Sequence, residues 1–488
     1  MNTTVNVTPR KSTQPGTAED LAPASGSIED YATQPEPAKR PFVTCRKHKK
    51  LVGMYCTADE IMNHPKYLDE LQEKVGANVV IMSSGVNYPP DIRKLAPFAP
   101  EQNQWIGMGY AEDDNTIHKC AEILHSRGMD IWLYSSGHSD RGNNDSYLPV
   151  DFNGEYLRNY PLLKYSLESQ STSALCFQKP EISQWQVNAY AWICKNYDID
   201  ALYCSHHRYN LPFHYCKLLG CACTDCQESA YRLGYNFDRM RQAMLGFQEN
   251  LGGLTKEQVK LVADVGITLT DFLHLQPDGN EAINWLKFRA TNVTDALSRI
   301  NKAVKEATEN QCRFIVDTVG PTLSYFVGHD YSTFVGEASD ALYCMAWIED
   351  QSICFAATWA QALVEMVDGL DESTALKAVY SLIGWDNIDL PHNRITDLHI
   401  APTRQEHDIP RFYRHFKSYL DSFMTHEYRH AAMIRNPEYP SYQTVFPHYW
   451  GREATEPLMD EIMALGHDGY IFEGSAQPFV NKPAHNQT

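Results

Sequence analysis

The densest run of chemically capable side chains follows a short apolar segment near the middle of the chain. Asp200 opens the segment Ala-Leu-Tyr-Cys, and Ser205, His206, His207 and Arg208 come directly after it. Histidine transfers protons near neutral pH and arginine binds carboxylate and phosphate groups, so this run could serve catalysis or binding. His206 and His207 are neighbours, so on a strand they point to opposite faces and at most one faces a common site. A structural histidine explains the pair as well as a catalytic one does.

Acidic residues end several other apolar segments. Asp317 follows Phe-Ile-Val, Glu473 follows Gly-Tyr-Ile-Phe, and Glu349 lies shortly after a second Asp-Ala-Leu-Tyr-Cys run. Paired carboxyl groups can act as general acid, base or nucleophile, and aromatic rings beside them suit a sugar. Although most loop acids in a chain of this size are solvated or cap helices, we predict these three as catalytic. The predicted substrate-binding residues are His138, Asp140, His206, His207, Arg208, Trp132, Trp347 and Trp385.

A cysteine cluster is the most specific local signal. Cys216, Cys221, Cys223 and Cys226 lie within eleven residues and include a CxCxxC pattern. Four thiolates could hold a structural zinc ion with tetrahedral geometry, and they would close its coordination sphere to substrate. The alternative is a set of reduced thiols packed in a loop. No cofactor is predicted to be required for the chemistry.

Eight short apolar segments alternate with helical patterns and would position these side chains. The expected strands are 50–56, 77–85, 130–137, 200–205, 312–317, 340–345, 378–383 and 468–473. The runs Asp200–Cys204 and Asp340–Cys344 share one sequence, which indicates a repeated βα architecture. Eight such units predict an α/β fold, a (β/α)8 TIM-type barrel with long βα-loop insertions and its active site at the C-terminal strand ends. A doubly wound open sheet is less favoured because no glycine-rich phosphate turn follows any strand.

The composition of the chain indicates its domain limits, its partners and its location. Residues 1–44 are rich in Ser, Thr, Pro and Ala and predict a disordered tail, followed by a barrel over 45–476 and a short tail over 477–488. The net charge of −19 argues against nucleic-acid and anionic-membrane partners and favours a neutral or cationic small molecule or oligosaccharide. The N-terminus lacks a signal-peptide pattern, so we expect a cytoplasmic protein with reduced thiols. The sequence leaves the oligomeric state open, and a homo-oligomer is compatible with it.

Scattered motifs carry a family resemblance over roughly residues 50–475. They are the run Asp200–Tyr209, the CxCxxC at 221–226, the helix start at 234–238, Trp285-x-x-Phe-Arg289 and Gly328-His-Asp-Tyr331. The chain resembles (β/α)8 glycoside hydrolases and related uncharacterised glycosyl-hydrolase-like proteins. Its CxCxxC segment is also similar to the zinc-bearing loop of some thermophile β-galactosidases. The resemblance implies a hydrolase that cleaves a glycosidic bond with a carboxylate pair.

One position departs from that group, which tends to carry an acid at the end of strand four. This chain has Ser205, which can neither protonate a glycosidic oxygen nor act as a carboxylate nucleophile. Two alternatives therefore stay open. One is a metal-dependent lyase, epimerase or hydrolase with ligands among His138, His206, His207, Asp317 and Glu349. The other is a catalytically inactive carbohydrate-binding barrel.

Overall fold

A closed barrel of eight parallel strands forms the centre of the structure. The computed structural model describes residues 48–95, 110–111, 114–136, 145–161, 163–167 and 175–483. The strands follow one another in sequence order around the barrel. They are β1 (Leu51–Tyr55), β2 (Val79–Met82), β3 (Asp130–Ser136), β4 (Ala201–Ser205), β5 (Arg313–Val319), β6 (Leu342–Met345), β7 (Ser441–Val445) and β8 (Gly469–Phe472). The predicted (β/α)8 TIM-type barrel is confirmed, and the predicted tail over 1–44 lies outside the described residues.

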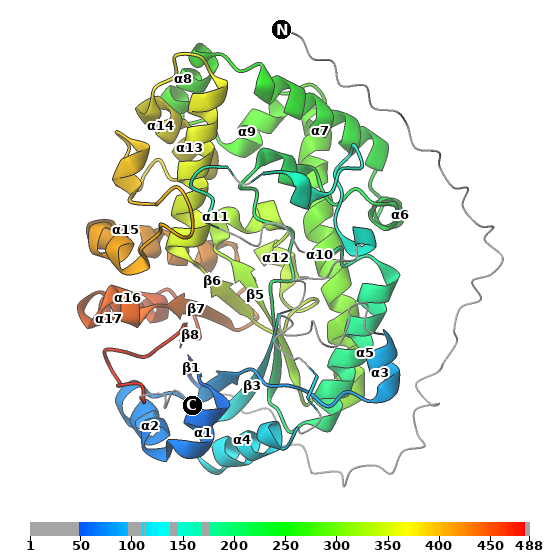
Figure 1. Cartoon of the computed structure of the whole chain (residues 1–488), viewed down its shortest axis with the longest axis vertical. Helices are drawn as coiled ribbons and strands as arrows, with labels where there is room; N and C mark the ends of the chain where they lie inside the picture. The colour runs from blue at the N-terminus through cyan, green and yellow to red at the C-terminus, as the bar shows by residue number, and fades with distance from the viewer. Residues whose placement is uncertain are drawn as a thin grey trace, which may run out of the picture. The chain divides into compact units, whose positions relative to one another are not determined.

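Helices surround the barrel and fill two long insertions (Figure 1). They are α1 (Ala58–Asn63), α2 (Pro65–Glu70), α3 (Pro90–Leu95), α4 (Asn115–Ser126), α5 (Pro180–Asn196), α6 (Thr224–Arg232), α7 (Phe237–Gly252), α8 (Lys256–Val265), α9 (Leu269–His274), α10 (Gly279–Thr308), α11 (Pro321–Ser324), α12 (Tyr331–Phe334), α13 (Cys354–Met366), α14 (Glu372–Ile383), α15 (Ile409–Ile434), α16 (Pro447–Trp450) and α17 (Arg452–Ala464). The β4–β5 connection contains α6 to α10, and the β6–β7 connection contains α13 to α15. Across the described ranges, no helix has the length and apolar character that a membrane crossing needs.

The prediction of strand seven is wrong. Residues 378–383 form the end of α14. This helix begins after Asp371, whose carboxylate accepts a hydrogen bond from the Thr374 amide at 2.9 Å. It ends at Gly384, which has a left-handed backbone. A short apolar run cannot by itself be told from one face of a buried helix. The seventh strand is Ser441–Val445, where buried polar side chains hide the apolar pattern of a strand.

One repeated contact joins the strands in pairs at their N-terminal ends. An Asn or Asp stands at the start of each even-numbered strand, and its side chain accepts a hydrogen bond from a backbone amide of the preceding odd-numbered strand. The pairs are Asn78–Val52, Asp200–Ile131, Asp340–Phe314 and Asp468–Ser441, at 2.9, 2.9, 2.7 and 2.9 Å. The same four residues donate their own amides back to the carbonyls of these partners. This exchange satisfies buried backbone groups at the strand starts and explains why two of these runs share one sequence.

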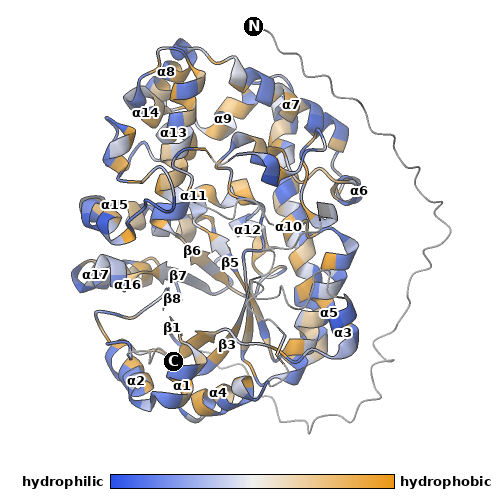
Figure 2. Cartoon of the chain, in the orientation of Figure 1, coloured by the Kyte–Doolittle hydropathy of each residue, from blue (hydrophilic) through white to orange (hydrophobic). Residues whose placement is uncertain are grey.

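Alternate strands fill the barrel interior in layers of four side chains, as expected for this fold. The strand register defines four successive layers from the N-terminal to the C-terminal end. They are Gly53, Trp132, Ile315 and Tyr442; Ile81, Tyr203, Tyr343 and Ile471; Tyr55, Tyr134, Asp317 and Thr444; and Ser83, Ser205, Met345 and Glu473. Figure 2 shows apolar residues along much of the strands. The interior layers become more polar toward the C-terminal ends of the strands. The site must therefore lie above the last layers.

A partly buried histidine connects α4 to the start of β4. The ring nitrogens of His125 lie 3.4 Å from a carboxylate oxygen of Asp198 and 2.9 Å from one of Asp200. Hydrogen bonds to Asp198 and Asp200 raise the pKa of His125 to about 9. Its folded-state pKa therefore lies above its unfolded-state pKa, and the stabilisation is lost as the pH rises through about 9.

We predict that His125→Gln lowers the free energy of unfolding by about 2 kcal/mol at pH 6 and by much less at pH 9.5. Urea unfolding at the two pH values measures this, with exposed His274→Gln as the matched control. A loss of stability that is equal at both pH values would contradict the assigned ion pairs.

Candidate active site

A cavity of about 550 Å³ opens at the C-terminal ends of the strands. Its volume is in the range of small-molecule sites. Its floor includes side chains of the last two barrel layers, and its walls come from the loops that follow the strands. The residues that line it include Tyr55, Ser205, His206, Arg208, Trp347, Asp350, Arg404 and Glu473. Four of these, His206, Arg208, Trp347 and Glu473, were predicted as site residues from the sequence.

Glu473 follows β8 and forms part of the cavity wall. Its Oε2 atom is buried and has no hydrogen-bond partner among the described residues. Burial raises the pKa of Glu473 to about 8; the hydroxyls of Tyr55 and Tyr343 act against this rise, and the charge of Asp317 adds to it. A carboxyl group with this pKa is mostly protonated at pH 7 and can donate its proton.

Asp317 lies one layer lower, on β5, and has the opposite environment. Its Oδ2 accepts hydrogen bonds from the hydroxyl of Tyr203 at 2.8 Å and from that of Ser205, and its Oδ1 accepts one from the amide of His206 at 3.2 Å. Ser205 therefore stands where an acid was expected, and it holds the carboxylate of the neighbouring strand at that place.

Three tyrosine hydroxyls connect the two sides of the cavity floor. Tyr55 donates to Tyr203 at 3.2 Å, and its oxygen lies 3.4 Å from that of Tyr343. Because Tyr203 donates onward to Asp317, the hydroxyl chain ends on that carboxylate. Burial raises the pKa of all three phenols, so they remain proton donors.

The two adjacent histidines follow the end of β4 and have different surroundings. His206 has a left-handed backbone (φ 61°), and its Nδ1 lies 2.8 Å from the Ser205 hydroxyl at the cavity. His207 is fully buried and its ring packs on Phe177 at 5.3 Å. Of the pair, only His206 lines the cavity.

His329, from the Gly-His-Asp-Tyr motif, is a structural residue behind β4. Its Nε2 lies 3.2 Å from the carbonyl of His207, and its Nδ1 accepts from the amide of Val319 at the same distance. Burial lowers the pKa of His329 to about 3, so the ring is neutral and joins the exits of β4 and β5.

Glu349 does not join the other two predicted acids. It lies in a π-helical turn (Ile348–Ile353), is fully buried, and accepts a hydrogen bond from the Tyr413 hydroxyl at 2.6 Å. Burial raises its pKa. Its neighbour Asp350 lines the cavity instead and lies 3.8 Å from Arg404.

The other predicted binding residues are placed as follows. Trp132 packs in the barrel interior, and Trp385 packs in the core, where it donates to Thr322 at 3.1 Å. Both indoles are fully buried and neither lines the cavity. His138 and Asp140 lie outside the described residues.

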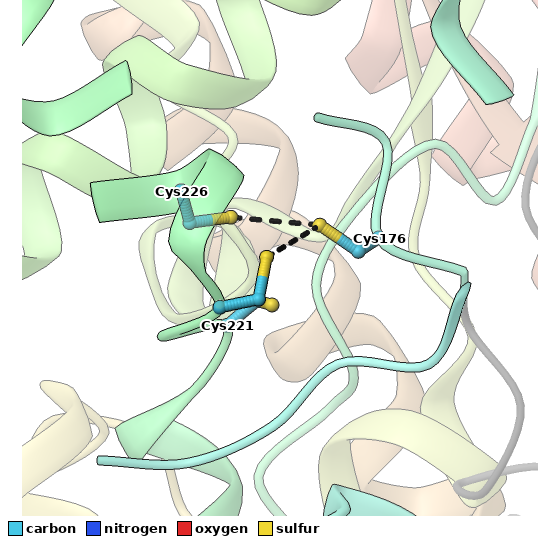
Figure 3. A group of neighbouring side chains, drawn as sticks. Cys176, Cys221 and Cys226 are labelled. Carbon is cyan, nitrogen blue, oxygen red and sulfur yellow. Dashed lines mark hydrogen bonds between the residues drawn. The ribbon is translucent and has the colours of Figure 1, made fainter. Parts of the chain in front are cut away.

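The cysteine cluster has a different fourth member from the one predicted. The sulfur atoms of Cys176, Cys221, Cys223 and Cys226 all lie within 4.8 Å of one another, and all four residues are buried. Figure 3 shows Cys176, from a separate segment, turned toward Cys226 at the start of α6. Cys216 is not in this group, because its short 3-10 helix directs it toward α7, where Gln248 donates to its sulfur at 3.4 Å.

The cluster fits a tetrahedral metal ion. The sulfur of Cys176 lies 3.6 Å from that of Cys223 and 3.5 Å from that of Cys226. A Zn–S bond of about 2.3 Å requires S–S edges of about 3.8 Å in a tetrahedron. Closed by four protein thiolates, such a site would be structural.

Some site residues escaped prediction from the sequence. Tyr203 carried a usable signal, because it and Tyr343 occupy the same place in the two repeated runs. Cys176 carried none, since it stands alone in the sequence before the CxCxxC pattern. Arg404 comes from the long β6–β7 insertion, whose path the sequence does not give.

The fold and the cavity define a (β/α)8 barrel with two unlike carboxyl groups at its C-terminal end. No family model and no curated protein matches the chain. Several solved structures do match it. The chain is similar to the PgaB (BpsB) glycoside hydrolase domain from Bordetella bronchiseptica, with 10% identity and a TM-score of 0.43 over 87% of this chain and 93% of that one.

Two further similar structures carry glycosidase names. An alpha-amylase from Lactobacillus plantarum has 10% identity and a TM-score of 0.36, over 87% of this chain and 71% of that one. A beta-galactosidase from the psychrophilic Marinomonas ef1 has 11% identity and a TM-score of 0.33, over 61% of this chain and 40% of that one.

The raised pKa of Glu473 has a consequence for stability. Because its folded-state pKa of about 8 exceeds the usual value of 4.5, the folded protein loses stability as the pH rises through this interval. We predict that the free energy of unfolding of Glu473→Gln rises by about 4 kcal/mol relative to that of wild type between pH 5 and pH 8.5. Thermal or urea unfolding at both pH values checks this. The control is Glu453→Gln, whose side chain is 92% exposed; an equal response of the two variants would contradict the assignment.

Proposed function

We propose that the protein is a glycoside hydrolase in which Glu473 is the general acid and Asp317 is the ionised partner. The observation that carries the proposal is the contrast between Glu473, which lines the cavity, and Asp317, which lies one interior layer below it. Burial raises the pKa of Glu473 to about 8, whereas Asp317 accepts three hydrogen bonds. Pairs of carboxyl groups with such unlike environments divide the acid and base roles in glycosidases.

The proposed reaction begins with proton transfer from Glu473 to the glycosidic oxygen. The C–O bond to the anomeric carbon then breaks, the leaving sugar keeps the proton, and positive charge develops on the remaining ring. The negative charge of Asp317 stabilises that ring. Water finally adds its oxygen to the anomeric carbon and returns a proton to Glu473. Trp347 offers an aromatic face, while His206 and Arg208 bind hydroxyl groups of the substrate.

The activity test uses a panel of aryl glycosides and oligosaccharides. We predict that Glu473→Gln lowers kcat/KM about 10²- to 10⁴-fold on substrates with poor leaving groups, because these need protonation. The loss should shrink on dinitrophenyl glycosides, whose leaving group needs no proton. Asp317→Asn should reduce turnover of both substrate types, and Glu453→Gln should change neither.

The pH profile provides a second readout from the same assay. Wild-type kcat/KM should fall as the pH rises through about 8, because Glu473 must be protonated to act. This alkaline limb should be absent in Glu473→Gln with dinitrophenyl substrates. If Glu473→Gln lowered kcat/KM equally for good and poor leaving groups, Glu473 would not be the general acid.

A catalytically inactive carbohydrate-binding barrel is the second candidate. Two observations favour it. β4 ends in Ser205, which cannot act as an acid or a carboxylate nucleophile, and both carboxylate oxygens of Asp317 already accept hydrogen bonds within the protein. Saccharide binding by calorimetry without turnover across the panel would support it over hydrolysis. A mixed His and carboxylate metal site, the third reading, finds no suitable cluster in the part of the chain that the structure describes.

The four clustered cysteines are proposed to hold one structural zinc ion. We predict that purified protein contains about one zinc per chain. Cys176→Ser should lose the metal and lower the melting temperature, whereas Cys216→Ser should retain it. Elemental analysis of the folded variants decides the point: zinc kept by Cys176→Ser and lost by Cys216→Ser would restore the ligand set expected from the sequence.

A further inference from the structure

One face of α10 contacts all three segments that carry the clustered cysteines. Trp285 donates its indole N–H to the carbonyl of Leu218 at 2.6 Å, shortly before the CxCxxC pattern. Asn292, two turns later, accepts hydrogen bonds from Gln178 at 2.9 Å and from Ser229 at 2.7 Å. Gln178 follows Cys176 by two residues, and Ser229 follows Cys226 by three.

Arg289 lies between these two anchors on the same helix face. Its side chain is fully buried. None of its three guanidinium nitrogens has a hydrogen-bond partner among the described residues. The guanidinium lies 4.3 Å from the ring centre of Tyr209, and that ring packs on Phe177 at 5.1 Å, next to Cys176.

A buried cation without a hydrogen bond costs several kcal/mol unless an opposite charge compensates it. Neutral thiols would offer Arg289 no such charge. Four thiolates around a divalent ion form a dianion. Lys179, which follows Cys176 by three residues, is paired with Asp225 at 2.7 Å. Arg289 and the loaded cluster therefore satisfy each other.

We propose that Arg289 is the buried counter-cation of a divalent metal tetrathiolate formed by Cys176, Cys221, Cys223 and Cys226. The inference rests on the proposed metal centre but not on the proposed glycosidase activity. Arg289 is a positioning residue here: it touches no metal ligand through a hydrogen bond and acts through charge. Removing its charge weakens the metal site without removing a ligand.

The test compares zinc affinity and stability in full-length variants. Arg289→Met should weaken zinc binding 10- to 100-fold in chelator competition, the range known for residues that support metal ligands. Arg289→Lys, which keeps the charge, should lose less. The control is Lys302→Met on the same helix, a position where the side chain is 78% exposed, and it should bind zinc as wild type does.

Metal-free protein gives a result of opposite sign. Once the metal is stripped by a chelator, Arg289 is an uncompensated buried charge, so Arg289→Met should melt at or above the wild-type temperature. In the zinc-loaded form the same variant should melt below wild type. A purely structural role of the arginine stem would destabilise both forms, and that outcome, including a failure of the metal-free variant to fold, would overturn the proposal.

Cobalt substitution provides a spectroscopic readout. A nearby cation lowers the energy of thiolate lone pairs, so its removal should move the sulfur-to-cobalt charge-transfer band to lower energy in Arg289→Met. An unchanged band together with unchanged zinc affinity would exclude the counter-cation role. Wild-type protein that binds neither zinc nor cobalt would instead refute the metal centre itself, whatever the variants do.

Discussion

The chemistry of the site depends on how two carboxyl groups are solvated by the protein. Asp317 is buried in the barrel interior, whereas Glu473 is partly buried and lines the cavity. Asp317 accepts hydrogen bonds from two hydroxyls and one backbone amide. The Oε2 atom of Glu473 has no such donor among the described residues, and burial raises its pKa. The two carboxyl groups therefore differ in their hydrogen-bond partners and in their access to the cavity.

The layered interior explains how the site tolerates serine at the end of β4. Ser205 and Asp317 lie on neighbouring strands, one layer apart, and the register brings the serine hydroxyl onto the carboxylate. Below them, Tyr203 donates to the same carboxylate from the middle of the interior.

The sequence predicts the barrel well because strand length, alternation with helices and the Asp-Ala-Leu-Tyr-Cys repeat all express local rules. It fails at Ala378–Ile383, where a buried helix face has the composition of a strand, and at Ser441–Val445, where polar side chains have buried partners. Of the three predicted acids, Glu473 lines the cavity, and it directly follows a strand. Glu349 and Cys176 depend on how long insertions fold back, which no local pattern encodes.

Contacts from several elements hold the start of the long β4–β5 insertion beside the cavity. Tyr209 is held by Asn292 at its hydroxyl, by Arg289 and Phe177 at its ring, and by Val327 at its amide. Its carbonyl in turn accepts a hydrogen bond from Arg208, which lines the cavity. A site held by such supporting contacts keeps its geometry better than a free loop does. Tyr209 and its neighbours thus connect the segments of the cysteine cluster with the residues proposed to bind substrate.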